Sequence, residues 1–553
     1  MADKLHLTAA GIALNRFGLG ARPDDAAPAD PRAWLLEQLD AYEPWPAAWA
    51  GEPGANVAFE RYAEARREAA AKAASEAAAS RAASQGGDAM ANRTLNSAPN
   101  RHPERARGQP ANAAIASQAA GQTPKQAARQ AVRREVRDAY LSAVDARVNS
   151  ALATNTPFVE RLVHFWANHF AISTEKPEVA ALAGAFEAEA IRPYVLGTFE
   201  ELVVAVERHP AMQIFLDQVR SVGPDSVAAL RASARDPAHP RGLNENLARE
   251  IMELHTLGVR TGYTQADVTE FARALTGWSV VGPQGGRAGG MTKTMAGMGK
   301  SPASRSAAPQ PVAPQPVAPQ PAAPQPAAPQ PVAGNFIFRP ELHEPGERTI
   351  MGRRYAEEGE AQAVAVLHNL AASRATARHI AFKLARHFVS DNPSPSTIER
   401  LASAFETSGG DLPTVYRALI ASPEAWASLP VKFKTPWDWT ISALRGIGVP
   451  RLDDRQHAAP MLTQLGQPVW RPGSPAGYDD VAASWAAPDA LMRRVELAQR
   501  LAARVGDGVD ARELGPRLMG GPLEPATALE ISRAESAPTA LALLLVSPDF
   551  QRR

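Results

Sequence analysis

The stretch TPFVERLVHFWANHFAIS, residues 156–173, predicts what kind of fold this chain adopts. Thr156 is a residue type that caps helices, and Pro157 follows at the first helical position, where its missing N–H is tolerated. Large apolar side chains then recur at helical spacing, with a histidine after them: Phe158, Leu162, Phe165 and His169. This period predicts an amphipathic helix that packs against a core.

Similar patterns on both sides of this stretch predict a mainly α fold. The segment TQADVTEFARALTG opens with Thr264 and Asp267 in a relation like a capping box and ends at Gly277. Helical patterns resume over residues 360–389, 397–409 and 488–546. The β-prone segments GWSVV and NFIFRPELHEPGERTIMG predict only a small β-hairpin element among these helices. We therefore expect a large helical domain.

Two low-complexity stretches interrupt the helical pattern. Residues 60–84 are rich in Ala, Glu and Arg and predict a solvated helix, but residues 85–123 are polar and punctuated by Pro and Gly, which predicts disorder. Residues 282–334 carry the repeat APQPV, whose prolines exclude a helix and favour an extended spacer. Because β-prone segments stand before and after this spacer, we expect an insertion between neighbouring strands of one domain, residues 1–553.

Composition excludes several classes of protein. The 59 Lys and Arg residues nearly balance the 58 Asp and Glu residues, so the net charge of +1 gives no reason to expect a nucleic-acid partner. The chain has no cysteine, which excludes disulfides, thiolate metal sites and a cysteine nucleophile. No apolar run reaches the roughly 18 residues of a transmembrane segment, and no signal peptide is evident. We therefore expect a cytoplasmic protein.

Several blocks along the chain resemble one bacterial family, the domain of unknown function 1800. They follow the family's order and cover nearly the whole chain outside the low-complexity stretches: LNRFGLGARP, HFWANHF, NENLAREIMELHTLGVRTGYTQADVTEFARALTGW, HEPGERTIMG, LARHFV, VKFKTPWDW and GQPVWRPGSPAGYDD. The family has no assigned activity. Many relatives resemble exported proteins that are encoded beside members of the unknown-function family 1501, which resembles sulfatases and alkaline phosphatases. The resemblance implies such a partner and an exported location, although the missing signal peptide departs from those relatives.

The segment NENLAREIMELHTLG, residues 244–258, carries the first candidate site residues. At about 100° per residue its buried stripe contains Leu247, Ile251 and Leu254. Polar residues border that stripe, with Asn246, Glu250 and Glu253 on one edge and Asn244 and His255 on the other. They either cap and cross-link helices, since buried polar groups must be hydrogen-bonded, or Glu250 and Glu253 bind a metal or transfer protons.

The segment HFWANHF offers two histidines with separate roles. His164 and His169 lie about 140° apart around a helix, so they cannot easily bind one ion from the same face. His169 shares the apolar face and is expected in the core. His164 lines up with Glu160 and Asn168 at one-turn spacing. This polar stripe is either a solvated face of the helix or a site where a carboxylate orients the imidazole.

Two further segments are predicted to be loops. In HEPGE, His343 lies beside carboxylates, a combination that suits a divalent metal, although the Pro–Gly turn explains much of the segment. The segment from GQPVWRPGSPAGYDD to the following SW contains three aromatic residues and an arginine: Trp470, Arg471, Tyr478 and Trp485. These side chains either line a groove for a sugar or peptide or, as we favour, attach an irregular loop to the core.

Two classes of function fit these patterns, and whether the chain is an enzyme is left open. The first is a binding or assembly factor that acts with a hydrolase-like partner or an envelope-related polymer, favoured slightly because no recognised catalytic motif is present. The alternative is a divalent-metal-assisted hydrolase. If a chemical site exists, we expect Glu250, Glu253, His164 and His343 around one cavity, oriented by Asn168 and Asn246.

Overall fold

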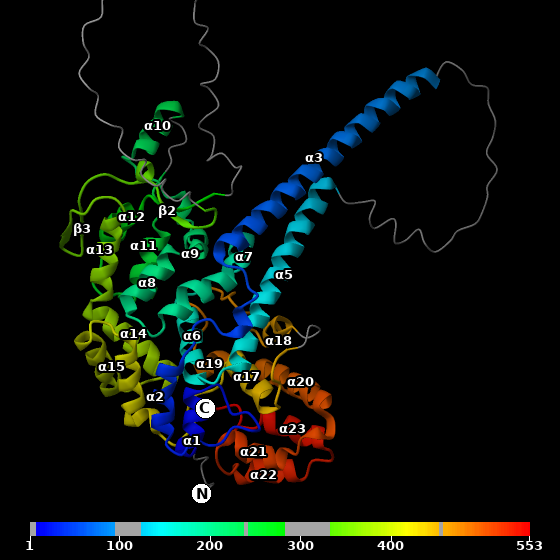
Figure 1. Cartoon of the computed structure of the whole chain (residues 1–553), viewed down its shortest axis with the longest axis vertical. Coiled ribbons are helices and arrows are strands. Elements are labelled where there is room, and N and C mark those ends of the chain that lie inside the picture. Colours follow the sequence, from blue (N-terminus) through cyan, green and yellow to red (C-terminus); the bar gives the residue numbers. More distant parts are fainter. Residues whose placement is uncertain (1–6, 95–122, 237–241, 283–331, 453–456) are drawn as a thin grey trace, which may run out of the picture.

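A computed structural model shows a mainly helical architecture with two small antiparallel sheets (Figure 1). The structure describes residues 7–94, 123–236, 242–282, 332–452 and 457–553, without the side chains of residues 80–94. The helices surround a core to which segments from the N-terminal, middle and C-terminal thirds of the chain all contribute. The expected fold class is confirmed.

The N-terminal half contains the following helices: α1 (Ala9–Ile12), η1 (Ala13–Phe17), α2 (Pro31–Ala41), η2 (Ala47–Trp49), α3 (Ala55–Thr94), α5 (Pro124–Ala153), α6 (Pro157–His169), α7 (Pro177–Phe186), η3 (Glu187–Ile191), η4 (Arg192–Tyr194), α8 (Phe199–Arg208), α9 (Pro210–Phe215), η5 (Gln218–Arg220), α10 (Val227–Arg235), α11 (Asn246–Glu250), η6 (Ile251–His255) and α12 (Gln265–Leu275). The strands are β1 (Trp278–Val280), β2 (Phe336–Phe338), β3 (Arg348–Ile350) and β4 (Arg353–Tyr355), with η7 (Pro340–Leu342) between β2 and β3.

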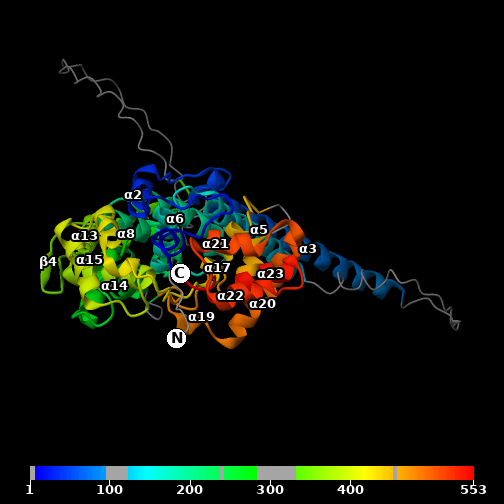
Figure 2. The same cartoon turned by 90° about the horizontal axis from the view of Figure 1, so that it is seen from below.

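The C-terminal half is again helical: α13 (Glu360–Ala371), α14 (Arg374–Phe388), α15 (Pro395–Thr407), α16 (Leu412–Ala421), η8 (Pro423–Trp426), α17 (Pro436–Gly446), α18 (Ala458–Gln464), α19 (Ala482–Trp485), α20 (Pro488–Val505), η9 (Gly506–Gly508), α21 (Ala511–Met519), α22 (Pro525–Ser532) and α23 (Ala537–Val546). Helices α20 to α23 pack together at the end of the molecule beside α17, as the view from below also shows (Figure 2).

Helix α6 is the central helix of the fold. It begins at Pro157 as predicted, although Thr156 precedes it without a side-chain capping hydrogen bond. Its predicted apolar face is buried, but so is almost every other residue of the helix, including Glu160 and Arg161. Because α6 is enclosed on all sides, its polar side chains must find partners inside the protein. The alternative of a solvated polar stripe is therefore corrected.

Helices α3 and α5 pack against each other and extend from the rest of the molecule (Figures 1 and 2). The Ala-rich helix expected over residues 60–84 is part of α3, and most side chains of residues 60–79 are exposed to solvent. Helix α3 continues to Thr94 and so includes residues 85–94, the beginning of the stretch expected to be disordered. The remainder of that stretch, residues 95–122, lies outside the described residues.

The strands before and after the proline-rich stretch pair with each other. β1 runs antiparallel to β2, with Trp278 opposite Phe338 and Val280 opposite Phe336. The expectation that β-prone segments join across this stretch is confirmed, while its residues 283–331 lie outside the described residues. β3 and β4 form a separate hairpin. The structure thus contains two small sheets where the sequence predicted one small element.

The segment of residues 244–258 departs from a regular helix. α11 ends at Glu250, and the next turn, Ile251–His255, is a π-helix that contains one extra residue per turn. Gly258 then takes a positive φ of 90°. The extra residue shifts the phase of every later side chain, so His255 enters the core instead of bordering the predicted stripe. There its Nδ1 lies 2.7 Å from Glu207 Oε1.

Candidate functional site

A cavity of about 440 Å³ opens beside the central helix α6. Its walls come from the second half of α6, one face of α14, the start of α17 and the loop of residues 467–480. Aromatic side chains supply much of this wall: Phe165, Phe382, Trp437, Trp470 and Tyr478. A concave site with an aromatic wall and several polar groups is a candidate for ligand binding.

Asn168 attaches the loop of residues 467–480 to α6. Its Nδ2 donates to Tyr478 O at 2.9 Å, and its Oδ1 accepts from Tyr478 N at 2.7 Å. Gly477, with φ of 82°, passes so close to α6 that a Cβ there would lie 2.2 Å from Asn168 O. Asn168 therefore positions one wall of the cavity, whereas it was predicted to orient the four expected ligands.

His164 lies in the cavity wall as a neutral imidazole. Its Nδ1 accepts from Trp437 Nε1 at 3.0 Å, and its Nε2 lies 3.6 Å from Glu160 Oε1. Burial, together with the charge of Arg147, lowers the pKa of His164 to about 4. Glu160 is held on its other side by Arg192, with distances of 2.9 and 2.7 Å. The predicted pairing of His164 with Glu160 is present, but it lies inside a buried ion-pair network.

Arg147 presents a guanidinium to the cavity between two indole rings. Its Cζ lies 4.3 Å from the ring centre of Trp437 and 5.5 Å from that of Trp470. Its Nε lies 2.8 Å from Glu187 Oε2, which also accepts from Trp470 Nε1 at 3.1 Å. Burial raises the pKa of Glu187 above its usual range. The terminal nitrogens of Arg147 make no hydrogen bond with any described residue, so they can bind a ligand.

Helix α14 lines the cavity with basic residues at every fourth position: His379, Lys383 and His387. Burial, with a smaller contribution from the charge of Arg386, lowers the pKa of Lys383 to about 8. Within the described residues, the Nζ of Lys383 makes no hydrogen bond or ion pair, and it is not among the fully enclosed polar atoms. Arg386 also lines the cavity, stacked 4.4 Å from the ring centre of Phe382.

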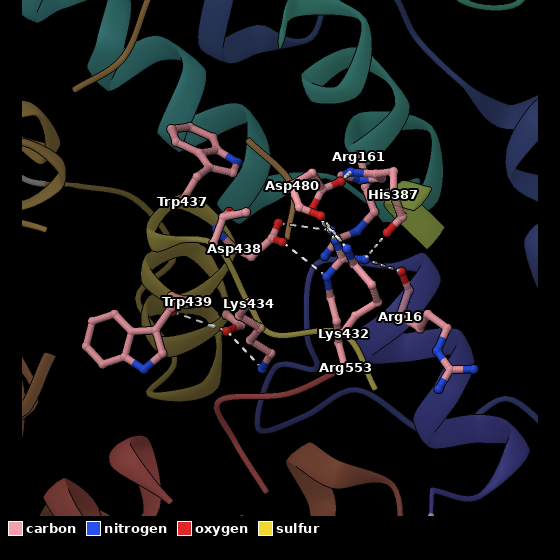
Figure 3. A network of polar contacts seen from close by, with 12 residues as sticks. Arg16, Arg161, His387, Lys432, Lys434, Trp437, Asp438, Trp439, Asp480 and Arg553 are labelled. Atoms are coloured by element: carbon pink, nitrogen blue, oxygen red, sulfur yellow. Dashed lines mark hydrogen bonds and ion pairs between the residues drawn. The ribbon is translucent and has the colours of Figure 1, made fainter. Parts of the chain in front are cut away.

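The acidic groups at the base of the cavity are already paired (Figure 3). Asp480 Oδ2 lies 2.5 Å from His387 Nδ1, and Asp480 Oδ1 lies 3.4 Å from Lys432 Nζ. Asp438 accepts from Arg161 at 2.9 Å and lies 3.1 Å from Arg553 Nε. Burial alone would raise the pKa values of Asp438 and Asp480, but these cations hold both values below their usual range. Both carboxylates are therefore ionised, and neighbouring cations balance their negative charges.

Three of the four expected ligands lie away from this cavity. Glu253 pairs with Arg249 at 3.5 Å, and His343 Nδ1 lies 2.8 Å from Thr276 O in a loop that closes on β1. Glu250 is half-buried, with its pKa raised by burial, and it does not line the cavity. Asn246 begins α11 and is exposed. Of the predicted set, the structure brings only His164 and Asn168 together at the cavity.

The cavity residues that the sequence analysis did not identify include Arg147 and the basic residues of α14. The spacing of His379, Lys383 and His387 was the available signal, because residues four apart share one helix face. Trp470 attaches the loop to the core through Glu187, as favoured, whereas the Tyr478 hydroxyl donates to Pro468 O within the loop, and both rings line the cavity. An aromatic residue of this loop can therefore both attach the loop to the core and line a cavity.

Comparison with known proteins gives a family and no function. The model of the family described as "Protein of unknown function (DUF1800)" matches residues 12–552. No curated protein and no solved structure matches the chain. Among the helices of the described residues, none is long and apolar enough to cross a membrane.

Proposed function

The chain belongs to the DUF1800 family, and we propose that it is a binding protein whose cavity beside α6 holds a small organic anion. The observation that carries this proposal is a pair of neighbouring cations in the cavity wall. Lys383 and Arg386 make no ion pair with a carboxylate among the described residues. Their charges repel each other, since Arg386 is one cause of the lowered pKa of Lys383. A bound anion would relieve this repulsion.

The charges around these two cations support an anionic ligand. Asp438 and Asp480, the acids at the base of the cavity, are neutralised by Arg161, Arg553 and Lys432. Asp479 is exposed at the rim and accepts from Ser484 Oγ at 3.0 Å. The terminal nitrogens of Arg147 add a third unmatched donor group. Since guanidinium and ammonium groups recognise carboxylate and phosphate oxygens, these are the ligand groups that fit.

The aromatic walls support a ligand that also has an organic part. Trp437 and Trp470 flank Arg147, and Phe165 and Phe382 approach from the two helices. Such rings bind planar or apolar groups through their faces and exclude water from them. A cavity of about 440 Å³ accommodates a small molecule and not a folded partner. The combination favours a carboxylate or phosphate attached to a small planar or apolar group.

Titration with anions tests this proposal, because Trp437 and Trp470 in the wall report binding through their fluorescence. We expect benzoate to bind more tightly than acetate or inorganic phosphate. Arg386→Met should weaken benzoate binding about tenfold, as expected when a charge-assisted hydrogen bond is lost. Arg378→Met is the matched control, because Arg378 lies on the exposed side of α14 and pairs with Glu399. Equal binding by both variants, or no binding of any anion at millimolar concentration, would contradict the proposal.

This proposal keeps the binding class of the predicted factor but names a small anion as the ligand, in place of a hydrolase-like partner or an envelope-related polymer. The alternative, a divalent-metal-assisted hydrolase, requires several ligands in one place. Within the described residues, no group of three or more His, Asp or Glu side chains is arranged to hold a metal ion. No observation therefore favours the alternative over anion binding. A partnership with the sulfatase-like family 1501 remains a proposal from the resemblance, which co-purification of the two proteins would test.

A further inference from the structure

We propose that Lys383 forms an imine with an aldehyde or ketone group of the ligand, so that the cavity takes an anionic carbonyl compound. This inference rests on the proposed anion-binding function, which brings the ligand to Arg386 beside Lys383. It adds the chemical class of the ligand and a covalent step. The residue that carries it is Lys383, whose amine lies in the wall of an open cavity and makes no hydrogen bond or ion pair with the residues that the structure describes.

The situation of Lys383 differs from that of two other buried lysines nearby. Lys432 Nζ donates to Asp391 Oδ1 at 2.6 Å and pairs with Asp480, so its charge is matched (Figure 3). Lys434 Nζ donates to Ser442 Oγ at 3.2 Å and lies 4.0 Å from the ring centre of Phe550, away from the cavity. Of these three lysines, Lys383 alone lines the cavity, and its amine makes no hydrogen bond or ion pair within the described part of the chain. Access, and not burial alone, distinguishes it.

An amine in such a place can act as a nucleophile at neutral pH. Burial lowers the pKa of Lys383 to about 8, so a substantial fraction is the neutral amine, whereas an exposed lysine is almost fully protonated. Burial also lowers the pKa of Lys434, to about 7, but Lys434 does not line the cavity. Lys434 therefore serves as an internal control that separates an altered pKa from accessibility to a ligand.

The proposed step is a condensation that releases one water molecule. The lone pair of Lys383 Nζ attacks the carbonyl carbon, and the carbonyl oxygen takes up a proton to give a carbinolamine. The C–O bond then breaks and the oxygen leaves as water, which carries away the two protons lost from Nζ. These protons move through solvent in the open cavity. No oxidant, reductant or further reactant is needed.

Charged and titratable groups surround Lys383 on several elements and set its protonation. Asp480, in the loop of residues 467–480, favours the charged amine, while Arg386 on α14 opposes it. Lys383 also interacts electrostatically with the imidazoles of His169 on α6 and His379 on α14. Burial keeps the pKa values of both imidazoles low, so they are neutral near pH 8 and the midpoint for Lys383 is not shifted by their titration.

Reductive trapping with two aldehydes tests the proposal on the whole protein. The protein is treated with glyoxylate, an anionic aldehyde, or with formaldehyde, each with cyanoborohydride, and the modified lysines are identified by mass spectrometry. We expect glyoxylate to label Lys383 about tenfold or more faster than the exposed Lys72 and Lys125 at pH 7.5. Lys432 and Lys434 should remain unlabelled. The labelling rate at Lys383 should rise with a midpoint near pH 8.

The two aldehydes separate failure of this inference from failure of the proposed function. If formaldehyde labels Lys383 selectively and glyoxylate does not, the ligand is not an anion. That result would overturn both this inference and the proposed anion-binding function. Selective labelling by neither aldehyde, or a midpoint near pH 10.5, would overturn the role of Lys383 and leave anion binding to its own titration. Lys383→Met should remove the fast label while Lys72 and Lys125 are labelled as before. Benzoate should slow the glyoxylate reaction if both proposals hold.

Discussion

Replacing Lys383 with methionine should stabilise the folded protein at neutral pH. In the folded protein the ammonium group lies in a partly enclosed cavity wall and makes no ion pair within the described residues. Burial lowers its pKa from 10.5 to about 8, although the charge of Asp480 opposes this shift. Methionine keeps the apolar stem of the side chain and removes the charge. The gain in stability should be greatest at pH values where the wild-type amine is charged. It should disappear at pH values where the amine is neutral in both the folded and the unfolded chain.

The size of this gain follows from the pKa. Since a tenfold change in proton affinity is about 1.4 kcal/mol, the lowering corresponds to about 3 kcal/mol, which solvent in the open cavity reduces to about 1–2 kcal/mol. A base whose folded pKa is lowered destabilises the folded state fully below that pKa. The penalty is therefore present below about pH 8, decreases between pH 8 and 10.5, and is absent above that window.

Urea unfolding of Lys383→Met and the wild type at pH 7 and pH 10 measures the effect. We expect the variant to be more stable by about 1–2 kcal/mol at pH 7 and by less than half of that at pH 10. Lys432→Met is the matched control: it removes a buried lysine paired with Asp391 and Asp480 and should destabilise the protein. A variant that is less stable than the wild type at pH 7, or a difference that does not change with pH, would refute this reasoning.

Three other changes probe the surroundings of the cavity. Glu160→Gln should cost about 3 kcal/mol or more in urea unfolding, because it leaves the buried Arg192 without its carboxylate; an unchanged midpoint would contradict the importance of this pair. Gly477→Ala should weaken benzoate binding about tenfold in the fluorescence titration, because a Cβ at positive φ and 2.2 Å from Asn168 O must displace the loop; unaltered binding would mean that the loop does not shape the site. Tryptic cleavage between residues 283 and 331 should leave fragments that elute together from gel filtration, because β1 and β2 pair across the cut; separate elution would contradict a single domain.

Local signals in the sequence predicted much of the fold. Pro157 at the start of α6, the capping box of Thr264 and Asp267, and Gly277 with its positive φ all lie where the sequence placed them. Each of these features depends on residues within one turn of the chain. The extra residue in the π-helical turn of Ile251–His255 was not predictable in this way, because tertiary contacts such as that of His255 with Glu207 maintain it.

The surroundings of the candidate site residues could not be predicted from the sequence, for a related reason. Edge positions on one helix do not reveal which neighbour the helix packs against. The site prediction for Glu250 and Glu253 depended on such positions. The cavity, however, forms between α6, α14 and the loop of residues 467–480, and neither glutamate lines it. Asn168 was identified because its polar stripe lies on α6 itself. His387 and Asp480, which are 93 positions apart, form their contact only through the fold.

The walls of the cavity are joined by contacts between residues that are very distant in the chain. Trp437 and His164 are 273 positions apart, and Trp470 and Glu187 are 283 apart. Such contacts close long loops. Because the entropic cost of closing a loop arises before the contacts can stabilise the fold, the cavity should be completed late in folding. A molecule that binds only the completed cavity therefore stabilises the whole folded chain in proportion to the logarithm of its concentration. A rise in melting temperature can consequently identify the natural ligand from a chemical library before any reaction is known.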